Sequence, residues 1–228
     1  MGRRDAIDGS GGSDLRTLLA GPVPLAARGL LGCVVTAGDV AVRLTEVEAY
    51  GGVDADPASH AHRGRTRRNA VMFGPAGHLY VYFTYGMHWC GNVVTGAPGE
   101  AAAVLLRAGE VISGHGAARG RRGPAVSDRD LARGPARLMV ALGLDGAVDG
   151  VALLDGAGPV TLSAGAPVDP ARIRSGPRVG VARAVETPWR FWLDGEPTVS
   201  PYRRAVPRSR RSATRPTAAD AEATPGRP

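Results

Sequence analysis

The stretch "VAVRLTEVEAY", residues 40–50, carries the clearest β-strand pattern in the sequence. It is rich in β-branched residues, and its side chains alternate with a period of two, as in a half-buried strand. The alternation predicts two faces, one with Leu44, Glu46, Glu48 and Tyr50 and the other with Arg43, Thr45, Val47 and Ala49. A carboxylate and an aromatic ring, those of Glu48 and Tyr50, should therefore project together from one surface of a sheet.

The segments around this strand mix strands and helices without a regular alternation. A short helix that ends near residue 32 passes into a strand, and a longer helix is predicted at 130–144. Further strands are predicted at 78–83, 90–96, 101–109, 150–156, 159–165 and 189–195. This order lacks β-α-β repeats, so it indicates an α+β fold, a single mixed domain around a curved, largely antiparallel β-sheet with flanking helices.

The chain length and its two ends define the expected domain organisation. With 228 residues, of which 43% are hydrophobic, the chain is long enough for one substantial core. Both ends are poor in large apolar residues, which favours disordered tails at 1–14 and 204–228. The ordered domain should therefore span 15–203.

Cysteine content and hydropathy exclude several classes of protein. Cys33 and Cys90 are the only cysteines, too few for a disulfide framework or for a four-cysteine metal or iron–sulfur site. The N-terminus has no apolar stretch of signal-peptide length, and no run of about 18 apolar residues occurs. We therefore expect a soluble cytoplasmic protein without a cofactor.

Positive charge is concentrated in one part of the chain. The formal net charge is +7, and no acidic residue lies between Asp56 and Glu100. Within this gap, "HAHRGRTRRN" groups four arginines, Arg63, Arg65, Arg67 and Arg68. A second group follows beyond the gap, in "GHGAARGRRGPA": Arg119, Arg121 and Arg122. Such a field suits a polyanionic partner, whereas a solvated surface explains a single arginine run equally well.

Aromatic residues are concentrated as well, in "HLYVYFTYGMHWCGN", residues 78–92. The chain is only 5% aromatic, yet this stretch holds Tyr80, Tyr82, Tyr85 and Trp89. Tyr85 precedes Gly86, which can adopt the positive φ of a hairpin tip. A tyrosine at such a tip is expected to insert into a partner, and base-on-ring stacking is worth roughly 1–3 kcal/mol. Nucleic acid with an extruded base fits both this cluster and the arginines, although packing is the usual role of strand tyrosines.

Six motifs together resemble a known family: "TEVEAYGG" (45–52), "RRNAVMFGPAGHLYVYFTYGMHWCGNVV" (67–94), "AVLLRAGE" (103–110), "DLARGPARL" (130–138), "RVGVARA" (178–184) and "PWRFWLDG" (188–195). In this order, over about 15–203, the chain resembles the alkyladenine type of 3-methyladenine DNA glycosylase. The resemblance implies one mixed domain without a metal. It also implies base excision repair of double-stranded DNA that contains alkylated or deaminated purines, by a monomer associated with the nucleoid.

The resemblance also implies roles for individual residues. Glu48 would activate the attacking water, and Arg107 would help to hold both. Tyr85 would be the wedge that enters the duplex, and Asn92 would lie where the amino group of guanine is disfavoured. Three side chains would line the pocket for the extruded base: Tyr50, His60 and Tyr82. Four arginines would contact the DNA backbone: Arg63, Arg65, Arg67 and Arg68.

Two features leave alternatives open. His60 lies ten residues after Tyr50, whereas some family members place this histidine nine residues on, so His62 is a second candidate for the pocket. A non-catalytic domain that binds damaged or single-stranded DNA would use the same rings and arginines. A metal-dependent hydrolase is a third alternative, suggested by the histidines near the aromatic stretch.

The expected chemistry is consistent with the composition. Hydrolysis of an N-glycosidic bond needs a carboxylate to deprotonate water and to balance the charge that develops on the sugar. A glycosylase that also cleaves the strand normally attacks the sugar with a lysine amine. The sequence has no lysine. A strictly monofunctional enzyme is therefore predicted, while the ranking among 3-methyladenine, 7-methylguanine, hypoxanthine and ethenoadenine stays open.

Overall fold

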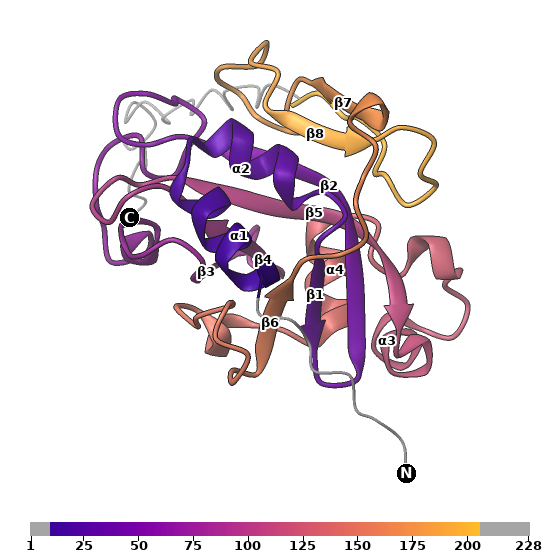
Figure 1. The fold of residues 1–228 in the computed structure, drawn as a ribbon. Helices are drawn as coiled ribbons and strands as arrows, with labels where there is room; N and C mark the ends of the chain where they lie inside the picture. Colours follow the sequence, from indigo (N-terminus) through magenta and orange to yellow (C-terminus); the bar gives the residue numbers. More distant parts are fainter. Residues whose placement is uncertain (1–9, 206–228) are drawn as a thin grey trace, which may run out of the picture.

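An antiparallel β-sheet forms the centre of the computed structural model, which describes the backbone of residues 10–205 and the side chains of 14–205 (Figure 1). Within these residues the sheet has eight strands in the order β3-β4-β5-β2-β1-β6, and β8 joins β2 to β7. The strands are β1 Val34–Ala37, β2 Val40–Tyr50, β3 Leu79–Thr84, β4 His88–Val94, β5 Ala103–Ser113, β6 Val160–Ser163, β7 Ile173–Gly176 and β8 Arg190–Leu193. The predicted α+β domain with a curved, largely antiparallel sheet is confirmed.

Short helices flank the sheet. The α-helices are α1 Ser10–Ala20, α2 Val23–Leu30, α3 His115–Arg122 and α4 Pro135–Leu142, and the 3₁₀ turns are η1 Ala70–Phe73, η2 Asp128–Asp130, η3 Gly146–Val148 and η4 Pro170–Arg172. Helices α1 and α2 lie side by side across the sheet, while α4 packs against β4 and β5 (Figure 1). Their buried faces and the strands form one aliphatic core, which includes Leu19, Leu106, Leu138 and Leu162.

The predicted strand at 40–50 is confirmed to the residue as β2, but its faces differ from the prediction. Its pairing with β5 has three irregularities: Ile112 is skipped near one end, and Thr45 of β2 and Arg107 of β5 are skipped beside Glu46. A bulge reverses the alternation of side chains. Leu44, predicted to share a face with Glu46, therefore lies in the aliphatic core. Glu46 and Glu48 remain together, and the bulge at Arg107 brings its guanidinium to them.

Several other elements differ from the sequence prediction. The segment 150–156 is not a strand and makes only a single bridge, from Ala152 to His78. The helix predicted at 130–144 is shortened to α4, because Gly134 has a φ of 133° that a helix cannot contain. The pattern also failed to predict α3 and β7. Glycines 116 and 120 weaken the local helix signal of α3.

The predicted domain boundary at residue 15 falls inside α1. The helix begins at Ser10, and its apolar side chains Leu15 and Leu19 are buried in the core. Of the predicted tails at 1–14 and 204–228, residues 1–9 and 206–228 lie outside the described residues. Among the helices that the structure describes, none is both long and apolar enough to cross a membrane.

Candidate active site

A cavity of about 600 Å³ opens between the strands that carry the predicted site residues. Strands β2, β3, β4 and β5 form its floor, and its rim is formed by the loop segments 57–60 and 179–183 and by residues 135–136 at the start of α4. All seven side chains predicted to serve catalysis, the base pocket or intercalation line this cavity: Glu48, Tyr50, His60, Tyr82, Tyr85, Asn92 and Arg107. Residues far apart in the chain are therefore brought together at one place.

Glu48 is fully buried and is held on three sides. Its Oε1 accepts a hydrogen bond from the backbone N–H of Val179 at 2.7 Å. Its Oε2 accepts one from the hydroxyl of Tyr50 at 2.8 Å. The Nη1 atom of Arg107 lies 3.4 Å from Oε1. The arrangement fixes the direction of a carboxylate at the cavity wall.

Arg107 is a fixed cation beside this carboxylate. Its Nε donates to Oε1 of Glu46 at 2.9 Å, and its Nη2 donates to Oγ of Ser200 at 3.1 Å. Burial opposes its charge, but the carboxylates of Glu48 and Glu46 outweigh burial and raise the pKa of Arg107. The side chain is therefore charged and oriented before any ligand binds.

Glu46 lies behind the cavity and binds two arginines at once. Besides Arg107, its Oε1 accepts from Nε of Arg190 at 2.7 Å and from Oγ of Ser200 at 3.0 Å. Its Oε2 accepts from the backbone N–H of Ser200 at 2.6 Å. Glu46 does not line the cavity. Of the two carboxylates on this face of β2, Glu48 alone lines the cavity.

Aromatic rings form one wall of the cavity. Tyr80 and Tyr82 are stacked, with ring centroids 5.8 Å apart and planes at 29°. His60 meets Tyr82 edge-on at 4.5 Å, and its Nδ1 lies 3.1 Å from the hydroxyl oxygen of Tyr80. Burial raises the pKa of Tyr80 to about 12 and raises that of Tyr50 well above its ordinary value. These phenols therefore stay protonated and uncharged at neutral pH.

The geometry distinguishes between the two candidate histidines. His60 lines the cavity, whereas His62 does not, and Nδ1 of His62 is buried without a hydrogen-bond partner. Partial burial, together with the nearby charge of Arg68, lowers the pKa of His60. The imidazole beside the aromatic wall is therefore neutral at neutral pH.

Asn92 and Cys90 lie side by side on the pocket face of β4. Nδ2 of Asn92 donates to the backbone oxygen of Tyr80 at 3.1 Å, which fixes the orientation of the amide. Cys90 is buried, and burial raises the pKa of its thiol. The amide is thus the polar group that a ligand edge would meet at this part of the floor.

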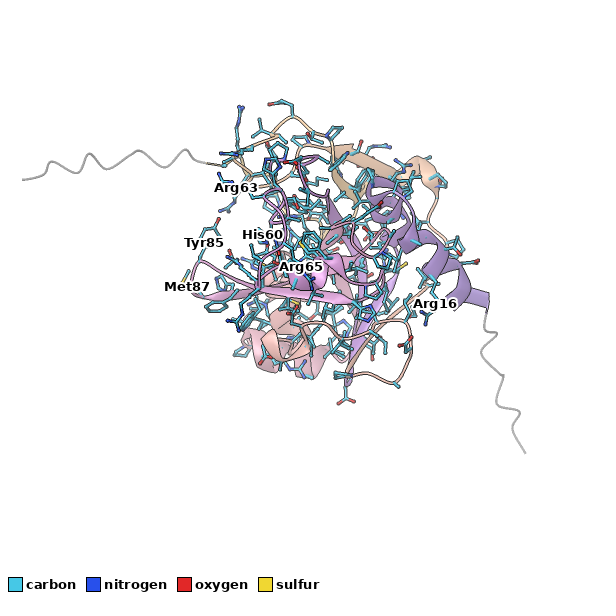
Figure 2. All side chains as sticks on the ribbon, turned by 90° about the vertical axis from the view of Figure 1, so that its left-hand side faces the viewer. Arg16, His60, Arg63, Arg65, Tyr85 and Met87 are labelled. Carbon is cyan, nitrogen blue, oxygen red and sulfur yellow. The ribbon has the colours of Figure 1, made fainter. Side chains whose placement is uncertain are left out.

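Tyr85 stands at the tip of the β3-β4 hairpin with 79% of its surface exposed. Tyr85 and Gly86 both have positive φ, 52° and 67°, and the N–H of Met87 donates to the oxygen of Thr84 at 3.1 Å. The predicted conformation of Gly86 is confirmed. Figure 2 shows Tyr85, Met87 and Arg63 along one edge of the molecule, away from Arg16.

The two arginine groups have different surroundings. Arg63, Arg65 and Arg67 are exposed, and Arg63 lies near Tyr85 (Figure 2). Arg68 turns toward the aromatic wall, where its Nη2 donates to the oxygen of Phe83 at 3.1 Å and its guanidinium lies 5.7 Å from the ring centroid of Tyr82.

The second arginine group makes contacts within the protein. The guanidinium of Arg119 pairs with Asp128. Arg121 and Arg122 donate to the backbone oxygens of Ala141 and Leu131. These contacts attach α3 to α4 and to the segment before it.

The structure adds residues to the site for which the sequence predicts no role. The backbone of Val179 contacts Glu48, and the neighbouring Arg178 is buried against Asp56 and Tyr50. The motif "RVGVARA" is a signal for this segment, but it does not reveal which backbone group is used. In the part of the chain that the structure describes, no three His, Cys, Asp or Glu side chains converge as metal ligands.

Comparison with known proteins gives one consistent result. A model of the methylpurine-DNA glycosylase family matches residues 17–197. A relative from Nocardia farcinica is 58% identical over 198 residues, 84% of this chain and 92% of the relative. A relative from Streptomyces avermitilis is 55% identical over 203 residues, 86% and 95% of the two chains. A relative from Mycobacterium tuberculosis is 50% identical over 184 residues, which are 79% of this chain and 89% of the relative. Each carries the provisional name 3-methyladenine DNA glycosylase.

Proposed function

The chain belongs to the methylpurine-DNA glycosylase family, and we propose that it releases 3-methyladenine and related alkylated or deaminated purines from double-stranded DNA. The damaged nucleotide turns out of the duplex into the cavity, and water hydrolyses its N-glycosidic bond. One observation carries this proposal. Glu48, a carboxylate fixed by Val179, Tyr50 and Arg107, lies in an aromatic-walled cavity directly beside an exposed tyrosine at a hairpin tip.

Each part of the cavity has a place in this reaction. The rings of Tyr50 and Tyr82 and the neutral His60 hold the flat base by stacking, and electron-rich tyrosine faces attract a cationic alkylated purine. Glu48 accepts a proton from water as the bond to the sugar breaks, and its charge balances the oxocarbenium-like sugar. Arg107 keeps the carboxylate in place. Asn92 lies on the floor, where it opposes a purine with a 2-amino group.

The proposed enzyme leaves an abasic site and does not cut the strand. Strand cleavage by elimination needs an amine that forms a Schiff base with the sugar, and the sequence contains no lysine. Arginine cannot replace it, because a guanidinium stays protonated at neutral pH. Water is therefore the nucleophile.

Incubation with methylated duplex DNA tests the function directly. Chromatography should detect released methylpurines, and alkali should cleave the DNA at the resulting abasic sites. Borohydride should trap no covalent adduct. Tight binding to damaged DNA without released base would instead favour the non-catalytic binding domain.

Replacing Tyr85 by alanine should slow base release from paired lesions by roughly 5- to 150-fold, which corresponds to the loss of about 1–3 kcal/mol of stacking. The loss should be smaller for lesions opposite a mismatch, because such bases are already partly unpaired. Single-turnover rates on the two duplexes measure the difference. Because Tyr85 is 79% exposed, the melting temperature of the variant should differ little from that of the parent.

Leu25→Ala is the matched control for Tyr85→Ala. Leu25 is also a large exposed side chain, at 58%, but it lies on α2 and does not line the cavity. Truncation of the Leu25 side chain should leave the release rates on paired and on mispaired lesions unchanged. An equal loss on paired and mispaired lesions in Tyr85→Ala would contradict the wedge role.

Replacing Arg63, Arg65 and Arg67 together by glutamine should flatten the salt dependence of DNA binding. Each phosphate contact on B-DNA contributes about 0.9 to the slope of log K against log salt, so three lost contacts reduce it by about 2.7. Fluorescence titrations between low and moderate salt measure this slope. The triple variant Arg119→Gln, Arg121→Gln, Arg122→Gln should keep the parental slope. Equal slopes in both triple variants would place the DNA elsewhere.

A further inference from the structure

An ion pair behind the cavity has no role in the chemistry described above. Arg178 is 1% exposed and Asp56 is 2% exposed. Nη1 of Arg178 donates to Oδ2 of Asp56 at 2.6 Å, and Nη2 donates to Oδ1 at 2.8 Å. The two residues are 122 positions apart in the sequence, so this fork joins two distant loops.

Arg178 is linked to two groups of the active site, the ring of Tyr50 and the carboxylate of Glu48. The guanidinium of Arg178 lies 4.8 Å from the ring centroid of Tyr50. Tyr50 lines the cavity and Arg178 does not, so the cation lies behind the ring that faces the base. The next residue in the chain, Val179, donates its backbone N–H to Glu48. One side chain thus supports both a pocket wall and a hydrogen bond to the carboxylate.

Asp56 fixes the other loop. Its Oδ2 accepts from the backbone N–H of Gly51 at 2.9 Å, and its Oδ1 accepts from that of Ala58 at 3.1 Å. These contacts span the segment that leads from Tyr50 to His60. Although burial opposes ionisation of Asp56, the hydrogen bonds from Arg178 and Gly51 lower its pKa, so the pair is ionic at neutral pH.

Stability alone does not account for this arrangement. Taking two charges out of water is costly, and apolar replacements for buried ion pairs are often neutral or stabilising. The cost is increased here because Nε of Arg178 is buried without a hydrogen-bond partner. The geometry instead has a consequence at the reaction centre, since displacement of Arg178 would release Val179 and the ring of Tyr50 together.

We propose that the Arg178–Asp56 pair is a positioning element that holds the Val179 N–H on Glu48 and the Tyr50 ring against the extruded base. Neither residue touches substrate. The proposal rests on the proposed function, because its effect is read as a rate of base release. It adds two residues, neither of them in the cavity wall, to those that the reaction depends on.

The test uses the double variant Arg178→Met with Asp56→Asn. Methionine fills much of the space without a charge, and asparagine still accepts a backbone hydrogen bond, so no buried charge is left unpaired. We expect the single-turnover rate to fall about 10- to 100-fold, since a displacement near 1 Å can cost this much. Affinity for DNA with an abasic-site analogue should stay within about threefold, because the hairpin and the arginines are unchanged.

Amide hydrogen exchange of Val179, measured by NMR without DNA, provides a readout that does not depend on activity. In the double variant this amide should exchange at least about tenfold faster relative to the amides of β5, because its contact to a buried carboxylate loosens locally. If the parent released no base, the proposed function would fail, while the exchange result would still report on the pair.

Leu162→Ala controls for lost stability. Leu162 is buried in β6, outside the cavity, so its truncation lowers the melting temperature without touching the site. It should keep the parental release rate and the parental relative exchange of Val179. Release within threefold of the parent in the double variant would overturn the proposal. Two other results would also overturn it. One is slower release in the double variant while the Val179 amide stays protected from exchange. The other is an equal loss of release rate in Leu162→Ala, if the two variants have equal melting temperatures.

Discussion

Replacing Glu48 by glutamine is expected to lower the single-turnover rate of base release by about 10²–10⁴-fold, the usual contribution of a positioned general base. Glutamine keeps the shape of the side chain and can still accept the Val179 N–H that now meets Oε1. It cannot take a proton from water, and it carries no charge to balance the sugar. Binding to an abasic-site analogue should therefore change little while release is lost.

The neutral lesion hypoxanthine is the appropriate substrate for this measurement. A cationic methylpurine already has a labile bond, so its release would mask part of the loss. Glu110→Gln is a suitable control, because Glu110 is an exposed carboxylate on the neighbouring strand β5 and should keep the parental rate. If Glu48→Gln kept more than a few per cent of the parental rate on hypoxanthine, another group would have to be the base.

Replacing Glu46 by leucine is expected to lower the free energy of unfolding by about 3–5 kcal/mol, the usual effect of removing one partner from a buried ion pair. Glu46 is 0% exposed and receives the Nε atoms of both Arg107 and Arg190. Its loss leaves Arg107 beside Ser200 and the more distant Glu48, and among the described residues it leaves Arg190 without a carboxylate partner, with the backbone oxygen of Ser200 and the ring of Trp192 as its contacts. Urea denaturation measures the change.

The surface ion pair between Glu110 and Arg43 provides the control, because the same Glu→Leu change there removes a carboxylate that is not buried. Glu110 accepts from Arg43 at 2.7 Å, but both side chains are partly exposed. Glu110→Leu should therefore change the unfolding free energy by less than about 1 kcal/mol. If Glu46→Leu were as stable as Glu110→Leu, the buried cluster would contribute no more than a surface ion pair.

Local patterns were sufficient for the parts of the fold that depend on neighbouring residues. The limits of β2 were predicted to the residue, because the alternation that marks a strand is present in those eleven residues. The positive φ at the hairpin tip was predicted from Gly86, since glycine adopts it without steric cost. The segment 150–156 has an equally apolar pattern, yet it pairs at Ala152 alone. Pairing requires a partner edge that no local pattern describes.

The candidate site was predicted largely through the resemblance, residue by residue, and the structure brings those residues to one cavity. The choice between His60 and His62 could not be made from the sequence. The spacing after Tyr50 allows both, and only the path of loop 51–60 turns one ring to the cavity. The contacts of the arginines near residue 120 were not predictable either, because charge composition does not reveal that Arg122 donates to a backbone oxygen.

What the sequence determined by itself is the chemistry available: a strand with Glu48, rings gathered near a hairpin tip, clustered arginines and no lysine. What the tertiary structure decided is which of these groups meet. The paired bulges at Thr45 and Arg107 move Leu44 into the core and bring a guanidinium to two carboxylates. The Arg178–Asp56 pair joins residues 122 positions apart. Such contacts depend on how whole strands and loops pack, and short-range propensity carries no information about a partner that distant.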